Sequence, residues 1–126
     1  MSAFSGIKAA NPAPKNSQSK TERANLYILA HPTGATELDI LRNAGLSSGR
    51  NYFTDLERSY GFTFTREKIP NSDGIGAHLK YSYSSLDIAE IIITAVNKSR
   101  IHRKLAEFTP EQKSELLKPI KHLLGN

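Results

Sequence analysis

The sequence predicts an α+β fold that is mainly α-helical, with three helices, a β-hairpin and then C-terminal helices. From residue 19 to residue 60, apolar residues recur every three or four positions, which is the spacing of one helix face. After Gly61 they alternate with polar residues in two segments, as they do in strands. Helical spacing returns beyond residue 84. The 126 residues are enough for one main core and too few for two full-sized domains.

The first ordered element is a helix that follows an N-terminal arm. Residues 1–18 are rich in Ser, Ala, Asn, Pro and Lys, so we expect a disordered basic arm. Ser19 and Glu22 have the spacing of a capping box, in which each side chain satisfies a backbone amide at a helix start. This predicts a helix over residues 20–30, which ends because Pro32 disfavours helical geometry at the residue before it.

Two further helices are expected before the hairpin. Thr36 can cap a short second helix, which ends where Gly45 supplies a left-handed C-terminal residue. Ser47 or Ser48 can then cap a third helix over residues 48–60. The connections between these helices are short, so the segment forms a tight helix-turn-helix unit.

The hairpin follows directly. Gly61 has the position of a second left-handed helix ending. Residues 62–69 and 77–84 alternate between two faces, and a dense run of turn residues over 70–76 separates them. This pattern predicts two strands joined by a flexible tip.

The C-terminal part predicts two helices. Residues 85–98 are long enough for a helix, although the β-branched run Ile91–Thr94 also allows a strand. A last helix opens at Thr109, where Gln112 completes a capping box, and Pro119 should kink it. The apolar residues that could join two copies of the chain are Ile92, Ile93, Val96, Leu116, Leu117, Ile120, Leu123 and Leu124.

Dimerisation through residues 85–126 is favoured because the apolar residues of the last predicted helix follow a predicted linker at residues 99–108. Pairing would also lengthen the surface that a small domain offers to a partner. The alternative is that both helices pack on their own domain.

Composition limits the class of protein. The chain has no cysteine, which excludes disulfide scaffolds, cysteine zinc sites and thiol catalysis. It has no membrane-spanning apolar stretch and no secretory signal, so we expect a cytoplasmic protein without a membrane partner. No catalytic motif is present, so we expect no enzymatic activity and no cofactor. No metal is expected either, because no pair at ligand spacing occurs among the four histidines His31, His78, His102 and His122.

The charge is positive but unevenly distributed. The net charge is +5, while residues 21–84 carry seven positive and seven negative side chains. The excess therefore lies in the two flanks. A basic chain favours an anionic partner, with nucleic acid first, but the middle can bind an anion only by placing its charges on separate faces.

Three helices followed by a hairpin, over Ser19 to Ser84, resemble the winged helix-turn-helix DNA-binding fold. The segment Thr36 to Gly61 is similar to that of small phage- and plasmid-type regulators. The resemblance implies that residues 19–84 form a domain that binds double-stranded DNA, with helix 48–60 in the major groove and the hairpin as the wing. Some domains of this fold serve protein contacts instead.

The third helix supports DNA binding through its own residues. Phe53, Leu56 and Tyr60 share one side, and the other side is polar. Arg can pair with guanine and Asn with adenine, while Ser and Thr contact bases or phosphates. A solvated polar face is the alternative. The candidate residues on this helix are Ser47, Ser48, Arg50, Asn51, Thr54 and Arg58.

The hairpin offers candidate phosphate contacts, although charged side chains also protect an edge strand from aggregation. These candidates are Arg66, Lys68, His78 and Lys80. Together the observations predict a dimeric, sequence-specific regulator of transcription from a phage, a plasmid or a bacterium, associated with the nucleoid. The alternative function is a protein-binding adaptor or an inhibitor of a host or phage complex, and RNA binding is a weaker option.

Overall fold

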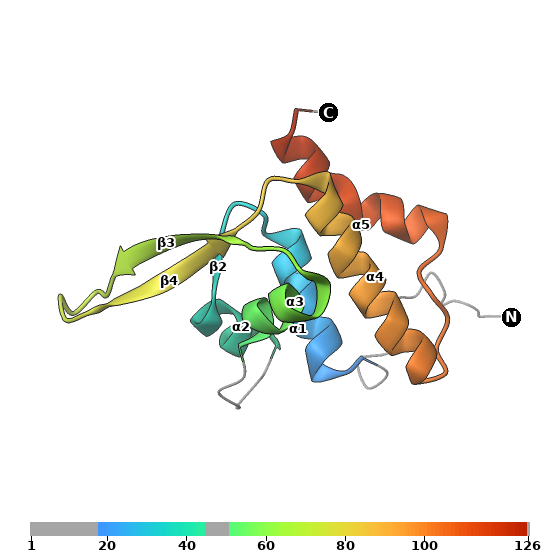
Figure 1. Ribbon diagram of the computed structural model, residues 1–126, viewed down its shortest axis with the longest axis horizontal. Helices are drawn as coiled ribbons and strands as arrows, with labels where there is room; N and C mark the ends of the chain where they lie inside the picture. Colours follow the sequence, from blue (N-terminus) through green and yellow to red (C-terminus); the bar gives the residue numbers. More distant parts are fainter. Residues whose placement is uncertain (1–17, 45–50, 126) are drawn as a thin grey trace, which may run out of the picture.

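The computed structural model describes residues 18–44 and 51–125 (Figure 1). This part of the chain is α+β and mainly helical, as predicted. No helix in it is long and apolar enough to cross a lipid bilayer. The elements in chain order are α1 (Lys20–Ala30), β2 (Ala35–Thr36), α2 (Glu37–Ala44), α3 (Tyr52–Tyr60), β3 (Thr65–Pro70), β4 (Ala77–Ser82), α4 (Leu86–His102) and α5 (Pro110–Leu123).

The first two helices begin where their caps predict. Ser19 Oγ accepts a hydrogen bond from the Glu22 amide at 3.0 Å, so the predicted cap of α1 is confirmed. The Glu22 carboxylate does not complete a capping box, because its Oε2 accepts from Arg100 in α4. At α2, Thr36 and Asp39 exchange two bonds, of 3.0 and 2.9 Å, between each side chain and the other's amide. The predicted ending at Gly45 lies outside the described residues.

The third helix begins later than predicted. Asn51 has extended backbone angles, φ −96° and ψ 101°, and its Oδ1 accepts from the Thr54 amide, so Asn51 is the N-cap of α3. A helix over 48–60 was therefore wrong at its start. Asparagine caps a helix as well as serine does, and the two residues after Asn51 are buried aromatics. The ending at Gly61 is confirmed by its left-handed conformation, with φ 72°.

The hairpin forms with both strands shorter than predicted, since the second strand ends at Ser82 and not at residue 84, and with a third strand beside it. Thr65 of β3 lies opposite Ser82 of β4, and Pro70 lies opposite Ala77. The first strand begins at Thr65 and not at residue 62. Strand β2, which was not predicted, pairs with the other edge of β4 in the order β2-β4-β3. Two residues are too short to produce a visible alternation.

The core draws on both the predicted DNA-binding domain and the C-terminal segment. Helix α4 forms as a helix and not as a strand, and α5 continues past Pro119 to Leu123. Helices α4 and α5 both pack on α1, as Figure 1 shows. One hydrophobic cluster joins residues of α1, α3, the sheet, α4 and α5, among them Ile28, Phe53, Tyr81 and Ile120.

This packing corrects most of the predicted dimer contact. Five of the proposed residues are buried in their own chain and have no surface to offer a second copy, so the alternative of packing within one chain applies to them. They are Ile92, Ile93, Val96, Leu117 and Ile120. Leu116 is partly buried against the same cluster. Only Leu123 and Leu124 of that set are exposed, at 42% and 41%.

The predicted linker at residues 99–108 is also tied to the body of the protein. Helix α4 extends to His102. Beyond it, the Phe108 amide donates to Asn97 Oδ1 at 2.9 Å, and Arg100 Nε donates to the Ala106 carbonyl at 2.7 Å. Helix α5 is thereby held against α4.

Candidate nucleic-acid interface

Helix α3 has the two faces that its sequence predicts. Phe53 and Leu56 are buried, and Tyr60 is half-buried against the core. On the outer side, the Arg58 side chain is 79% exposed, with its Nη1 3.8 Å from Asp55 Oδ1. A long ion pair between exposed groups contributes little and does not hold the guanidinium. Arg58 is therefore available to an anionic partner.

Asn51 and Thr54 are used within the fold. Asn51 Oδ1 caps α3, and its Nδ2 donates to Glu37 Oε2 at 3.1 Å and to the Tyr81 hydroxyl at 3.3 Å. The Thr54 hydroxyl donates to the Asn51 carbonyl at 3.1 Å. An amide with both ends engaged has to give up these bonds before it can pair with adenine. Asn51 therefore positions α3 in this structure, and its contact with adenine stays a prediction from the sequence.

Three of the predicted base-contacting residues have no described position. Ser47, Ser48 and Arg50 lie outside the described residues. Their contact with DNA stays a prediction from the sequence.

Arg66 joins the hairpin to α3 and is not a free phosphate contact. Its Nη1 and Nη2 donate to the two carboxylate oxygens of Glu57 at 2.8 and 2.6 Å, and its guanidinium lies 5.0 Å from the centre of the Tyr81 ring. The hydrogen bond from Arg66 lowers the pKa of Glu57, and the same bond raises the pKa of Arg66. Glu57 Oε2 also accepts from the Phe64 amide at 2.7 Å.

The other hairpin candidates differ in availability. Lys80 Nζ lies 3.6 Å from Glu67 Oε1, and its stem crosses Gly34, where an added Cβ would come within 2.6 Å of Lys80 Cδ. His78 Nδ1 lies 2.8 Å from Asn71 Oδ1. Lys68 is exposed on β3. Within the described ranges no ion pair involves Lys68, so it is the predicted hairpin cation most open to phosphate.

The hairpin tip is closed by hydrogen bonds. The Gly74 amide donates to the Asn71 carbonyl at 3.0 Å, Asn71 Nδ2 donates to the Ile75 carbonyl at 2.8 Å, and the Ile75 amide donates to Asp73 Oδ1 at 2.9 Å. Ile75 is 76% exposed at the tip. The tip that was predicted to be flexible thus has a defined internal structure that presents an apolar side chain.

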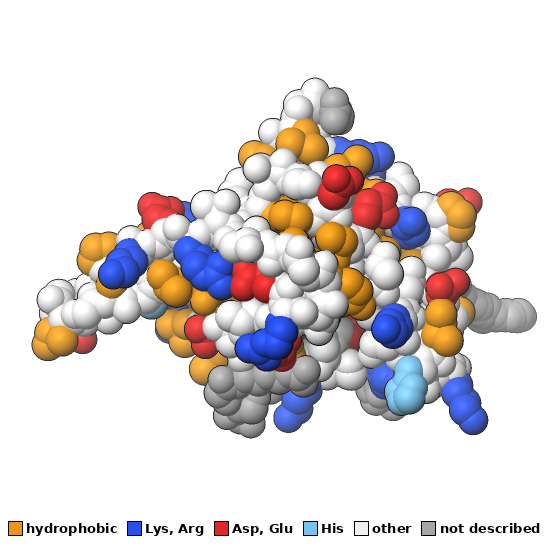
Figure 2. Space-filling model, viewed as in Figure 1, with side chains coloured by type: hydrophobic (Ala, Val, Ile, Leu, Met, Phe, Trp, Pro, Cys, Tyr) orange, Lys and Arg blue, Asp and Glu red, His pale blue; other side chains and the backbone are white. Residues whose placement is uncertain are grey.

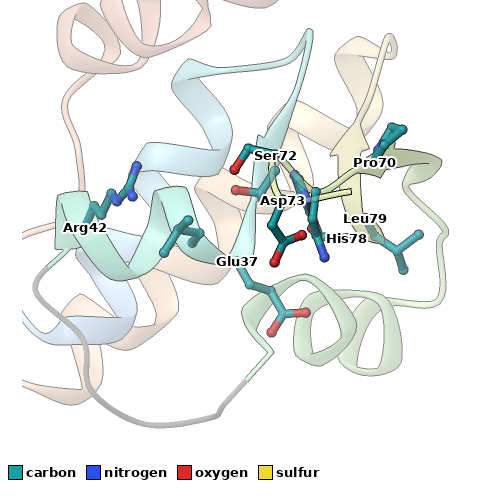
Figure 3. A pocket seen from close by; sticks show the side chains of 10 residues that line it. Glu37, Arg42, Pro70, Ser72, Asp73, His78 and Leu79 are labelled. Carbon is teal, nitrogen blue, oxygen red and sulfur yellow. Dashed lines mark hydrogen bonds between the residues drawn. The ribbon is translucent and has the colours of Figure 1, made fainter. Parts of the chain in front are cut away.

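A groove of about 590 Å³ lies between α2 and the hairpin (Figure 3). Figure 3 shows Arg42 of α2 on one side and Asp73 and His78 of the hairpin on the other. Its lining residues are Thr36, Glu37, Leu38, Arg42, Pro70, Asn71, Ser72, Asp73, His78 and Leu79. The sequence did not predict this groove, because its two walls are about thirty residues apart in the chain.

Charges around α3 and the hairpin are largely paired. Arg58, Arg66 and Lys80 each have a carboxylate partner within 4 Å. In Figure 2, blue and red side chains alternate over this part of the visible face.

The described part of the chain contains no group of three or more His, Asp or Glu side chains that could hold a metal ion.

Comparisons with protein-family models, with curated proteins and with solved structures found no match to this chain.

Proposed function

We propose that this chain is a double-stranded DNA-binding protein with a winged helix-turn-helix layout. The observation that carries the proposal is the joint position of α3 and the hairpin. The hairpin extends from the helical body (Figure 1), and the start of α3 is hydrogen-bonded to it through Asn51 and Tyr81. A helix for the major groove and a hairpin for the flanking phosphates are thereby held in one unit.

The available cations define the contacts within this proposal. Arg58 on the outer side of α3 is a candidate for base or phosphate contact. Lys68 on β3 is a candidate for phosphate contact, and Lys80 adds a second positive charge to the same hairpin. Sequence preference depends on Arg58 together with Ser47, Ser48 and Arg50. Regulation of transcription is the role that such preference would serve, and phage, plasmid or bacterial origin is part of the same proposal.

Selection from a pool of random duplexes with the full chain tests the proposal. We expect one sequence to be enriched and to bind with strong salt dependence. Arg58→Ala should weaken binding to that sequence by about 1–3 kcal/mol and relax its preference. Lys68→Gln should weaken binding to all duplexes alike and lower the log-log salt slope by about 0.9. Lys118→Gln on α5 is the control. No enrichment together with no salt-dependent binding would overturn the proposal.

The groove between α2 and the hairpin favours a second candidate function, the protein-binding adaptor. Leu38 is 48% exposed in its wall, and Leu41 of the same helix is 43% exposed. Exposed apolar side chains beside a concave surface are typical of protein contacts. This function predicts weak duplex binding without enrichment of any sequence. It also predicts that Leu38→Asp abolishes binding of a protein partner and that Lys68→Gln leaves that binding unchanged.

A further inference from the structure

The strongest unassigned positive surface lies at the end of the molecule away from the hairpin. Figure 1 shows the start of α1 and the end of α4 at the same lower edge of the view, and Arg103 after α4 lies 4.0 Å from Glu22 in α1. Blue and pale blue side chains gather there in Figure 2. We call this surface the α1/α4 basic patch; its members are Lys20, Arg23, Lys98, His102, Arg103 and Lys104.

The patch carries unneutralised charge. Glu22, which lies beside the patch at 4.0 Å from Arg103, is 1% exposed and is already paired with Arg100 at 2.8 Å. Glu107 is exposed in the connection to α5. Lys20, Lys98 and Lys104 are exposed, and none of them forms an ion pair within residues 18–44 and 51–125. On α3 and the hairpin, by contrast, Arg58, Arg66 and Lys80 each have a carboxylate partner within 4 Å.

Helix dipoles do not account for the patch. A cation near the C-terminus of a helix is stabilised by the dipole, which suits His102 in the last turn of α4. Lys20 is the first residue of α1, where the dipole disfavours a positive charge. Basic residues from the start of α1 and from the end of α4 therefore lie at the same end of the molecule, although the dipole of α1 disfavours the charge of Lys20.

We infer that the α1/α4 basic patch binds the phosphate backbone of the same duplex that α3 and the hairpin contact. The inference rests on the proposed function. Helices α2 and α3 lie between the hairpin and the patch in Figure 1, so the two ends would hold phosphates on both sides of the segment that α3 reads. A surface of lysines without a binding cavity fits a repeating polyanion, because such contacts need charge and not a shaped pocket.

The test compares two variants of equal net charge. Lys20→Gln, Lys98→Gln and Lys104→Asn together remove three patch charges, with Asn chosen because Lys104 has a φ of 63° that Asn tolerates. Lys113→Gln, Lys118→Gln and Lys121→Gln together remove three charges from α5. Both variants lower the net charge from +5 to +2.

Binding of the selected duplex is measured by fluorescence anisotropy at several salt concentrations. The patch variant should lose about 2.7 from the log-log salt slope, at about 0.9 per phosphate contact, and the α5 variant should keep the wild-type slope. Equal slopes for the two variants would overturn the inference and leave the proposed function standing. Absence of any wild-type binding would instead overturn both. An unchanged slope, with loss of binding to phosphatidylserine vesicles in the patch variant alone, would assign the patch to a membrane surface and overturn the inference.

Discussion

The side-chain amide nitrogen of Asn51 lies 3.3 Å from the hydroxyl oxygen of Tyr81. Asn51 caps α3, and Tyr81 lies in the middle strand of the sheet, where its ring stacks on Phe53 of α3 with centroids 4.0 Å apart. The hydrogen bond and the stacked rings together set the position of α3 relative to the hairpin. Both elements contribute to the proposed DNA contact, so this link connects the fold to the function.

Tyr81→Phe should remove the hydrogen bond between α3 and the hairpin, with measurable effects on both stability and DNA affinity. The phenylalanine ring keeps the stacking on Phe53 and loses the hydroxyl, so we expect a loss of about 1 kcal/mol in the free energy of unfolding. The affinity for DNA should fall several-fold, because the start of α3 is no longer tied to the hairpin. Urea denaturation and fluorescence anisotropy measure the two effects.

The matched control is Tyr83→Phe. The Tyr83 hydroxyl donates to the buried carbonyl of Leu29 in α1 at 2.6 Å, so this hydrogen bond does not link α3 to the hairpin. Its loss should lower stability by at least as much and leave the affinity of the folded protein for DNA unchanged. If the Tyr81 and Tyr83 variants bound DNA with equal affinity, the hydrogen bond between Asn51 and Tyr81 would have no role in positioning α3 for DNA.

The pair of Glu57 and Arg66 should make stability depend on pH. The hydrogen bond from Arg66 lowers the pKa of Glu57 below its ordinary value of 4.5 in the folded protein. The unfolded chain therefore binds a proton at higher pH than the folded chain does. The stabilisation is complete above pH 4.5 and is lost as the pH falls through the lower, folded pKa.

Glu57→Gln tests this dependence. At pH 7 the variant should be less stable by about 1–3 kcal/mol, because a bidentate, charge-assisted contact is lost. The difference from wild type should shrink as the pH is lowered from 5 to 3 in urea denaturation. Glu67→Gln, in which a 63% exposed partner of Lys80 is replaced, is the control. A difference that is constant over this range would contradict the assigned role of Glu57.

The sequence predicted the elements better than the contacts between them. Capping residues such as Ser19, Thr36 and Thr109 act within three positions, and the helix starts at these three sites were correct. Asn51 was misjudged because two serines before it are equally good caps, and only burial of the aromatics after it decides between them. Contacts between distant segments, such as β2 with β4, have no local signal.

The candidate site was predicted less well than the fold, because more of it depends on contacts between residues that are distant in the sequence. Arg66 follows Glu57 by nine residues across a helix end, so its pairing could not be predicted from helical or strand spacing. An apolar stripe looks the same whether its own domain or a second copy covers it. Ile120 was therefore assigned to a dimer, although it is buried within the chain.

The ion pair of Glu22 and Arg100 should be a strong link between α1 and α4. Their oxygen and nitrogen are 2.8 Å apart, with side-chain exposures of 0% and 10%, and Arg100 also lies over the Phe108 ring. Glu22→Gln should cost about 3–5 kcal/mol because it leaves a buried guanidinium without a counter-charge. The double variant with Arg100→Met should cost less than the sum of the single changes.

A double-mutant cycle in urea measures that coupling. The exposed pair of Lys118 and Glu115, at 2.8 Å with exposures of 66% and 69%, is the control and should show a coupling below about 1 kcal/mol. Equal couplings for the two pairs would show that burial of Glu22 adds nothing to its contact with Arg100.

The role of α5 can be decided by two substitutions, one within the helix and one directly after it. Ile120 is fully buried in the core and Leu124, just after the helix, is 41% exposed. Ile120→Ala should lower the free energy of unfolding by about 2–5 kcal/mol, whereas Leu124→Ala should change it by about 0.5 kcal/mol or less. For a monomer, both melting temperatures are independent of protein concentration. If Leu124→Ala were the more costly change and the wild-type melting temperature rose with concentration, Leu123 and Leu124 would form the contact between two copies.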